Sequence, residues 1–246
     1  MSKNRIYVKE LKGEGDYLAL SKENSKIVKS VLRLRKGDEI ELVDGEGALY
    51  FAHVAKVGKE GCHVTIYQRG SYPDNNPNKI TLLQAFPKGK RTELIIQKVV
   101  ELGVDRIIFF PAERSVAVVK KDKSPLKLSR MEKIIVEALR QSKRLYKPEI
   151  VIAQYFHEIF KIVKNCDLKL LLHEDQKGEP IKGWLSKIQS PKDIAFAIGP
   201  EGGFSEKEAA SFINEGFHKL KLGEEILRTD TAPIAVMSIL NYEFRW

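Results

Sequence analysis

The sequence predicts an α/β protein in two parts, a small N-terminal β-barrel and a larger C-terminal domain built on a parallel sheet. Up to about residue 70, short apolar runs separated by turn residues are typical of the strands of a barrel. Beyond residue 78, strand-like runs alternate with helix-like runs, which favours a largely parallel sheet with helices on both faces. Residues 70–78 (GSYPDNNPN) separate the two patterns and are rich in Pro, Asn and Gly, as linkers are. We therefore predict domains at 1–72 and 73–246.

The first part is expected to contain several short strands and one helix. The helix is predicted over 25–32, where apolar residues recur at helical spacing. A hairpin turn is predicted at 44–47 (DGEG), because glycine tolerates the positive φ that tight hairpins require. The strands are predicted at 5–8, 16–20, 38–43, 48–57 and 62–67.

The second part is expected to alternate strands with helices. A capping box is predicted at the start of one helix, because Ser205 is followed three residues later by Glu208. The strands are predicted at 79–86, 106–110, 168–172, 194–198 and 217–222, and the helices over 91–102, over 125–143 and after the last two strands.

Composition limits the class of protein. The chain has 246 residues, of which 43% are hydrophobic, enough to bury a substantial core. Its net charge of +9 attracts polyanions, so RNA, DNA and anionic membranes are all candidate partners. The alternative is that the positive charge serves only solubility. Two cysteines and five histidines show no metal-ligand spacing, and no apolar run has the length of a signal peptide or a membrane span. We expect a soluble cytoplasmic protein without a metal.

Three polar, glycine-bearing loops follow predicted strands, at 171–178, 198–205 and 222–233. The carboxyl ends of parallel strands meet at one edge of the sheet, and open α/β sheets bind their ligands at that edge. We therefore expect these loops to form one pocket.

Two of these loops contain residues that need an explanation. The helix after the second loop is already capped, so Gly199, Gly202 and Gly203 are better explained by a close approach of the main chain to a ligand, with a tight turn as the alternative. In the third loop, the hydroxyl of Thr229 or Thr231 is expected to cap the last helix. That cap leaves Arg228 without a structural role.

Several long motifs carry a resemblance to a known family. They are AIGPEGGFSEKE (197–208), LGEEILRTDTAP (222–233), KGKRTELIIQKVVELGVDRIIFFPAERS (88–115), EALRQSKR (137–144) and VLRLRKGDEIELVDGEG (31–47). Taken in the order in which they occur along the chain, they resemble the ribosomal RNA uracil-N3 methyltransferases of the RsmE type, which belong to the SPOUT class. The resemblance covers nearly the whole chain.

The resemblance implies a PUA-like β-barrel for RNA followed by a SPOUT-type α/β domain with a deep trefoil knot, acting as a homodimer on 16S ribosomal RNA or the small ribosomal subunit. It also implies that S-adenosyl-L-methionine binds within the knot, held by the three loops. The implied cofactor-binding residues are Leu172, His173, Glu174, Gly199, Pro200, Glu201, Gly202, Gly203, Leu222, Gly223, Ile226, Leu227, Arg228 and Thr229. Two positions depart from the family pattern: Asp230 stands where Glu is commoner, and Lys143 where Gly is commoner.

The chemistry of the implied reaction suggests roles for charged residues. Uracil N3 must lose its proton before it can attack a methyl group, so we expect a cation to stabilise the uracil anion and a carboxylate to help accept the proton. The candidate cations are Arg114, Arg144 and Arg228, and the candidate carboxylates are Glu201 and Asp230. The candidate RNA-binding residues are Arg33, Arg35, Lys88, Lys90, Arg91, Lys143, Arg144 and Lys147.

Two other functions fit the sequence. A non-catalytic RNA-binding or ribosome-assembly protein would use the barrel and keep the second domain as a scaffold. A related methyltransferase would act on another base, a 2′-hydroxyl or transfer RNA, since a fold alone does not define the target.

Overall fold

The computed structural model describes residues 4–246 except 10, 12, 14, 71–75, 116–123 and 174–177, and the side chain of Ser124. The chain divides into two compact units. The first comprises residues 1–75 and 139–147, and the second comprises 76–138 and 148–246. Residues 139–147 thus join the first unit, although they lie within the range predicted for the second domain. Each unit is described separately below.

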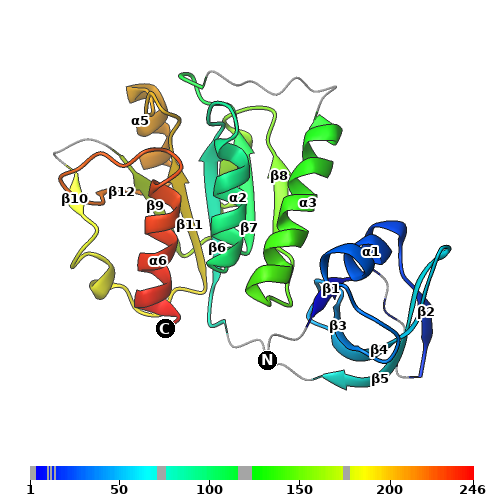
Figure 1. The fold of residues 1–246 in the computed structure, drawn as a ribbon. Coiled ribbons are helices and arrows are strands. Elements are labelled where there is room, and N and C mark those ends of the chain that lie inside the picture. The colour runs from blue at the N-terminus through cyan, green and yellow to red at the C-terminus, as the bar shows by residue number, and fades with distance from the viewer. Residues whose placement is uncertain are drawn as a thin grey trace. The chain divides into compact units, whose positions relative to one another are not determined.

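The first unit is a curved five-stranded sheet in the order β1-β3-β4-β5-β2 (Figure 1). The pairs β3/β4, β4/β5 and β2/β5 are antiparallel, whereas β1 pairs with β3 in parallel. Inward-facing residues such as Ile40, Val54 and Ile66 form its core together with Val28 from the helical segment. The strands are β1 (Arg5–Tyr7), β2 (Tyr17–Ala19), β3 (Glu39–Val43), β4 (Leu49–Gly58) and β5 (Gly61–Gly70).

The helical segment and the turn of the first unit were predicted with different accuracy. The helix begins earlier than expected, as α1 (Lys22–Lys26) with Ser21 as N-cap, and continues as a π-helical turn, η1 (Ile27–Val31). The hairpin turn lies where it was predicted, between β3 and β4. There Gly45 has a φ of 81°, and the Asp44 carboxylate accepts hydrogen bonds from the N–H groups of Glu46 (2.7 Å) and Ala48 (3.0 Å).

A buried ion pair ties residues 139–147 to the sheet of the first unit. Arg5 is 5% exposed, and its Nε lies 2.8 Å from the Glu41 carboxylate. The same guanidinium donates a hydrogen bond to the carbonyl of Lys143. Lys143 has a φ of 58°, in the left-handed region, so the backbone turns sharply where α3 (Ser124–Ser142) ends.

The second unit is built on a seven-stranded parallel sheet in the order β10-β12-β9-β11-β6-β7-β8. This confirms the predicted α/β class and parallel sheet. Two strands were not predicted, β8 and β10. The strands are β6 (Lys79–Ala85), β7 (Arg106–Phe110), β8 (Glu149–Ile152), β9 (Leu168–Leu172), β10 (Glu179–Pro180), β11 (Asp193–Ile198) and β12 (His218–Lys221).

Helices cover both faces of this sheet (Figure 1). On one face, Phe160 of α4 and Phe212 of α5 pack with strand residues such as Leu83 and Ala197. On the other face lie α2, α3 and α6, and α2 contacts α6. The predicted capping box of α5 is confirmed, with Ser205 and Glu208 in both hydrogen bonds. The helices are α2 (Arg91–Glu101), α3, α4 (Glu158–Ile162), α5 (Glu206–Asn214) and α6 (Ala232–Phe244), with a 3-10 turn, η3, at Leu185–Lys187.

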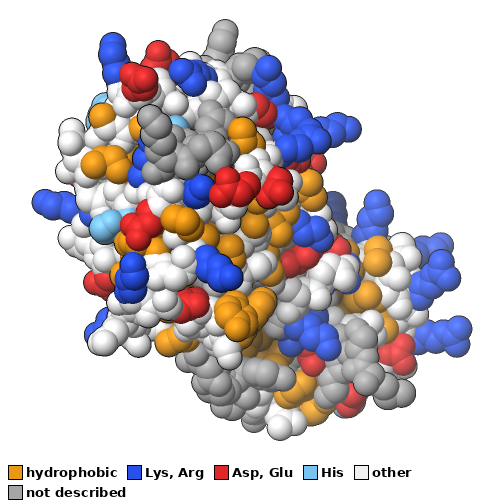
Figure 2. Space-filling view, turned by 90° about the vertical axis from the view of Figure 1, so that its left-hand side faces the viewer, with side chains coloured by type: hydrophobic (Ala, Val, Ile, Leu, Met, Phe, Trp, Pro, Cys, Tyr) orange, Lys and Arg blue, Asp and Glu red, His pale blue; other side chains and the backbone are white. Residues whose placement is uncertain are grey.

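The surface mixes charge types. On the face drawn in Figure 2, Lys and Arg side chains project at many points, with Asp, Glu and hydrophobic side chains between them. In the described part of the chain, no helix is both long enough and apolar enough to cross a membrane.

Candidate functional site at the edge of the parallel sheet

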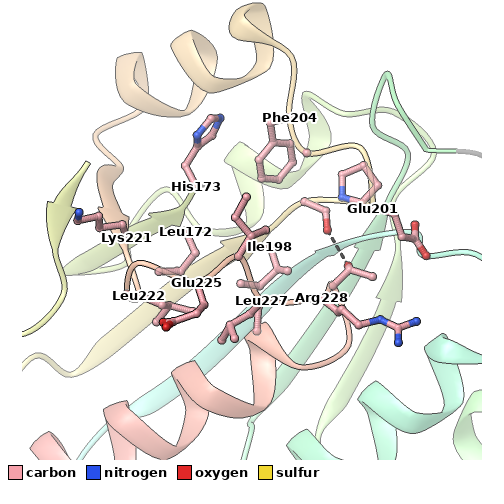
Figure 3. Close-up of a pocket in the computed structure, with 17 residues that line it drawn as sticks. Leu172, His173, Ile198, Glu201, Phe204, Lys221, Leu222, Glu225, Leu227 and Arg228 are labelled. Atoms are coloured by element: carbon pink, nitrogen blue, oxygen red, sulfur yellow. Dashed lines mark hydrogen bonds between the residues drawn. The ribbon is translucent and has the colours of Figure 1, made fainter. Parts of the chain in front are cut away.

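The three loops singled out in the sequence converge on one cavity. Strands β12, β9 and β11 are neighbours and parallel, so their carboxyl ends lie at the same edge of the sheet. The loops that follow them enclose a cavity of about 350 Å³ (Figure 3). A volume of this order suits a small organic ligand. The loops therefore form a pocket, as the sequence predicted.

Most of the residues predicted to bind the cofactor line this cavity. They are Leu172, His173, Gly199, Pro200, Glu201, Gly203, Leu222, Gly223, Ile226, Leu227, Arg228 and Thr229. Gly202 does not line it, and Glu174 lies outside the described residues. Five lining residues were not among the predicted cofactor-binding residues, although all but Lys221 lie in the predicted loops: Ile198, Phe204, Lys221, Glu225 and Ala232. Ile198 and Lys221 are the last residues of their strands, so the strand ends were a usable signal for them.

A buried hydroxyl links the second and third loops. Thr229 is 5% exposed, and its Oγ1 donates to the carbonyl of Gly199 at 2.7 Å (Figure 3, dashed line). The same oxygen accepts a hydrogen bond from Nε2 of the buried Gln84 at 3.1 Å. The prediction that a threonine hydroxyl caps the last helix is therefore wrong. Thr231 occupies the N-cap position but makes no side-chain capping bond. The Thr229 hydroxyl instead donates to Gly199 in the wall of the cavity.

The glycines of the second loop have separate explanations. Gly203 has a φ of 67° and donates its N–H to the Pro200 carbonyl at 2.9 Å, so it closes a tight turn. Gly202 faces Arg114, since a Cβ on it would lie 3.3 Å from the Arg114 Cβ. Of the three glycines in this loop, Gly199 and Gly203 line the cavity and Gly202 does not. Gly202 thus faces Arg114 and not the cavity, and Gly203 fits the alternative of a tight turn.

Charged side chains alternate in sign beside the cavity. Glu201 accepts hydrogen bonds from the backbone N–H of Lys88 (2.9 Å) and from the guanidinium of Arg91. Arg91 Nε also lies 3.7 Å from Asp230 Oδ2, and Arg228 Nε lies 3.9 Å from Asp230 Oδ1. Two carboxylates and two guanidinium groups therefore form one chain of opposite charges, which the sequence did not reveal because its members come from different segments.

The two carboxylates differ in their surroundings. Burial raises the pKa of Glu201, but the hydrogen bonds from Lys88, from its own backbone N–H and from Arg91 outweigh burial, so its pKa lies below the ordinary value. Glu201 is therefore held as a weakly basic carboxylate. Oδ1 of Asp230 is buried and accepts no hydrogen bond from any described group. Asp230 Oδ1 thus accepts no hydrogen bond within the described chain, whereas the Glu201 carboxylate accepts hydrogen bonds from Lys88 and Arg91.

Comparison with known proteins identifies the family. A family model described as an RNA methyltransferase domain matches residues 74–241, and one described as an RNA methyltransferase PUA domain matches residues 21–67. A ribosomal RNA small subunit methyltransferase E from Buchnera aphidicola subsp. Schizaphis graminum is 30% identical, over 98% of this chain and 96% of that protein. This chain belongs to the ribosomal RNA small subunit methyltransferase E family.

Solved structures of methyltransferases share the fold. A methyltransferase from Legionella pneumophila in complex with bound SAM is 33% identical, with a TM-score of 0.90 and coverage of 98% of both chains. A ribosomal RNA small subunit methyltransferase E from Neisseria gonorrhoeae, bound to S-adenosyl methionine, is 28% identical, with a TM-score of 0.87 and the same coverage. The fold of this member of the methyltransferase E family is therefore that of cofactor-binding relatives over almost its full length.

The other predicted cations of this methyltransferase E family member are distributed over both units. In the second unit, Arg114 donates to the carbonyl of Gly202 at 2.9 Å, and Lys88 and Lys90 are exposed beside the paired Arg91. In the first unit, Arg33 and Arg35 are exposed. Lys143, Arg144 and Lys147 also belong to the first unit, not to the unit that holds the cavity. Among the described residues, no cluster of His, Cys, Asp or Glu could hold a metal ion.

Proposed function

We propose that this chain transfers a methyl group from S-adenosyl-L-methionine to N3 of a uridine in 16S ribosomal RNA. The observation that carries this proposal is the cavity formed by the three loops after β9, β11 and β12. Its support is that the loop motifs resemble those of uracil-N3 methyltransferases and that two relatives of the same fold contain S-adenosylmethionine.

The residues of the cavity fit this cofactor. Its walls combine apolar side chains, including Leu172, Ile198 and Leu227, with main-chain groups of the loops, a suitable mixture for an adenosine with polar substituents. The Thr229 hydroxyl holds the second loop against the third, which helps to organise the walls before a ligand enters. The cofactor, when bound, supplies a sulfonium methyl group. The chain's own residues must then orient the uracil and accept its N3 proton.

The charged chain beside the cavity supplies candidates for these tasks. Arg228 is 70% exposed at its side chain and points away from the apolar centre (Figure 3), so its guanidinium is accessible to a uracil carbonyl oxygen. We assign Arg228 to stabilise the negative charge on O2 or O4. We assign Asp230 to receive the N3 proton, because its Oδ1 has no hydrogen-bond donor, whereas Glu201 is occupied by Lys88 and Arg91.

The wider organisation is also part of the proposal. Residues 1–72 serve as a PUA-like RNA-binding domain and 73–246 as a SPOUT-class methyltransferase domain with a trefoil knot. The support for the knot is the resemblance of the loop motifs at 197–208 and 222–233 to those of SPOUT-class enzymes. The protein acts as a homodimer in the cytoplasm on the small ribosomal subunit. Tyr242 and Trp246, which are 76% and 78% exposed, are apolar surface that a partner subunit would cover.

The decisive experiment incubates the protein with methyl-labelled S-adenosylmethionine and unmodified small ribosomal subunits, followed by nucleoside analysis. Recovery of labelled 3-methyluridine supports the proposal. Label on another nucleoside or on a ribose would show that the enzyme methylates a different position. Failure to bind the cofactor would favour a non-catalytic RNA-binding protein. Asp230→Asn should lower kcat more than Glu201→Gln does. Unchanged turnover in both Arg228→Ala and Arg144→Ala, at saturating cofactor and RNA, would exclude an anion-stabilising role for either arginine.

A further inference from the structure

The first unit carries a second hollow, remote in sequence from the three cavity loops. It is a shallow pocket of about 490 Å³ lined by Tyr17, Leu34, Arg35, Lys36, Ala55, Lys56 and Val57. We call it the Tyr17 pocket. It combines one aromatic ring with three cations, and none of its lining residues is acidic. That composition differs from an ordinary mixed surface and suggests an anionic, aromatic ligand.

Tyr17 presents its ring to solvent. The residue is 59% exposed, and its ring stacks on that of His63, with centroids 5.0 Å apart and planes 15° from parallel. This follows from strand geometry, because Leu18, its neighbour in β2, points into the core and Tyr17 must point out. The stack holds one face of the ring while the residue stays largely exposed, so Tyr17 is a preformed stacking platform.

Two of the cations, Arg35 and Lys36, lie on a turn that is hydrogen-bonded to β4, and the third, Lys56, lies in β4 itself. Gly37 donates its N–H to the Val54 carbonyl at 2.8 Å, and Val54 donates to the Asp38 carbonyl at 2.9 Å, which fixes the turn carrying Arg35 and Lys36 against β4. The Asp38 carboxylate is occupied by the backbone N–H of Arg35 at 2.7 Å. Within the described parts of the chain, the side chains of Arg35, Lys36 and Lys56 make no ion pair. Their charge is therefore available to an external anion.

Sheet stability alone explains this arrangement incompletely. A cross-strand aromatic pair stabilises a sheet by packing, but it requires neither a largely exposed ring nor cations around it. A double-stranded RNA would use the cations for its phosphates and leave the ring unused, because its bases are already stacked. A single strand uses both, since its unstacked bases pair with aromatic rings and its phosphates with Lys and Arg.

We propose that the Tyr17 pocket binds a nucleotide of single-stranded RNA, with the base stacked on Tyr17 and the adjacent phosphates held by Arg35, Lys36 and Lys56. This inference rests on the proposed function, because it specifies how the first unit holds the RNA whose uridine is methylated. It predicts preference for single-stranded over duplex segments of the substrate, with little discrimination among bases.

The test measures binding of the whole protein to a fluorescent 12-nucleotide RNA of mixed sequence and to the same strand in a duplex. Tyr17→Ala should weaken single-strand binding about ten-fold, as loss of one base–aromatic stack does, and duplex binding less than two-fold. Tyr17→Phe should bind like the wild type. Lys56→Ala should weaken binding of both the single strand and the duplex, and the dependence of RNA affinity on salt should fall by the equivalent of about one phosphate contact.

The matched control is Tyr155→Ala. Tyr155 is 63% exposed and stacks on His157, with planes 11° from parallel, but its neighbour is the Glu158 carboxylate, which accepts its backbone N–H. The Tyr155→Ala variant should bind RNA like the wild type. The proposal would be overturned if Tyr17→Ala lost no affinity for RNA, or lost as much affinity for the duplex as for the single strand. It would also be overturned if Tyr155→Ala lost as much affinity as Tyr17→Ala, or if the wild type bound no RNA. Affinity for S-adenosylmethionine, measured in the same variants, should not change. Loss of cofactor binding in the wild type would instead contradict the proposed function.

Discussion

The hydroxyl of Thr229 and the carbonyl of Gly199 lie 2.7 Å apart, and their hydrogen bond joins two loops through residues that are 30 positions apart in sequence. Both residues line the cavity, and the amide of Gln84, which is fully buried in β6, donates to the same hydroxyl. The direction of each bond follows, because an amide N–H can only donate and a carbonyl can only accept. The walls of the cavity are thus tied to the centre of the sheet.

Replacing Thr229 by Val should loosen this cavity. The Gly199 carbonyl and the Gln84 amide each lose a partner inside the protein, which costs about 1–3 kcal/mol in the free energy of unfolding. Calorimetry should show S-adenosylmethionine affinity reduced about ten-fold, the equivalent of about 1.4 kcal/mol. Thr229→Ser keeps the hydroxyl and should retain most of the affinity. Unaltered cofactor binding in Thr229→Val would show that the bond between the loops has no part in shaping the site.

The Glu201 carboxylate should make stability depend on pH. Its pKa is lower in the folded chain than its ordinary value of 4.5, so its contribution to stability is present near neutral pH and is lost as pH falls through the folded-state pKa. Urea unfolding at a series of pH values should show a smaller loss on acidification in Glu201→Gln than in the wild type. The exposed Glu243 provides the control as Glu243→Gln. Parallel acid profiles for the wild type and Glu201→Gln would contradict the role of Lys88 and Arg91 in holding this carboxylate.

Gly203 should tolerate substitution poorly. At a φ of 67°, an L-residue is strained, so Gly203→Ala is expected to lower the free energy of unfolding by about 1 kcal/mol and to weaken cofactor binding. Asparagine adopts this conformation more readily, so Gly203→Asn should be milder. Thermal unfolding and cofactor titration of the two variants test the order. If Gly203→Asn is as damaging as Gly203→Ala, the side chain's volume, not its backbone conformation, is decisive.

Lys143 should be a site where glycine stabilises. Its φ of 58° at the end of α3 is the conformation in which helices commonly end with glycine. Lys143→Gly is expected to raise the free energy of unfolding by about 1 kcal/mol. Lys143→Ala removes the same charge without relieving the backbone, so it should give no gain. Equal gains in the free energy of unfolding for Lys143→Gly and Lys143→Ala would show that the effect comes from the lost charge. The backbone carbonyl at position 143, which accepts from the buried Arg5, is present in the wild type and in both variants.

Local patterns were predictable where short-range interactions decide the structure. Ser205 and Glu208 of the capping box are three positions apart, so its hydrogen bonds were evident from spacing. Strand β9 lies at the predicted residues, because its apolar run is continuous and sharply bounded. Strand β8 was missed because it follows the end of α3 closely and no Gly or Asn marks its start, and its strand structure is fixed by pairing with β7.

The sequence therefore determined the two-part architecture, the parallel sheet and the three loops that form the cavity, since each depends on periodicity, turn residues or recognisable motifs. The tertiary structure alone decided which side chains meet. It assigned the Thr229 hydroxyl to Gly199 instead of a helix cap, joined Arg91 to Glu201 and Asp230, and turned Gly202 toward Arg114. These contacts join residues far apart in the chain, and their partners are chosen by packing, which no local pattern in the sequence encodes.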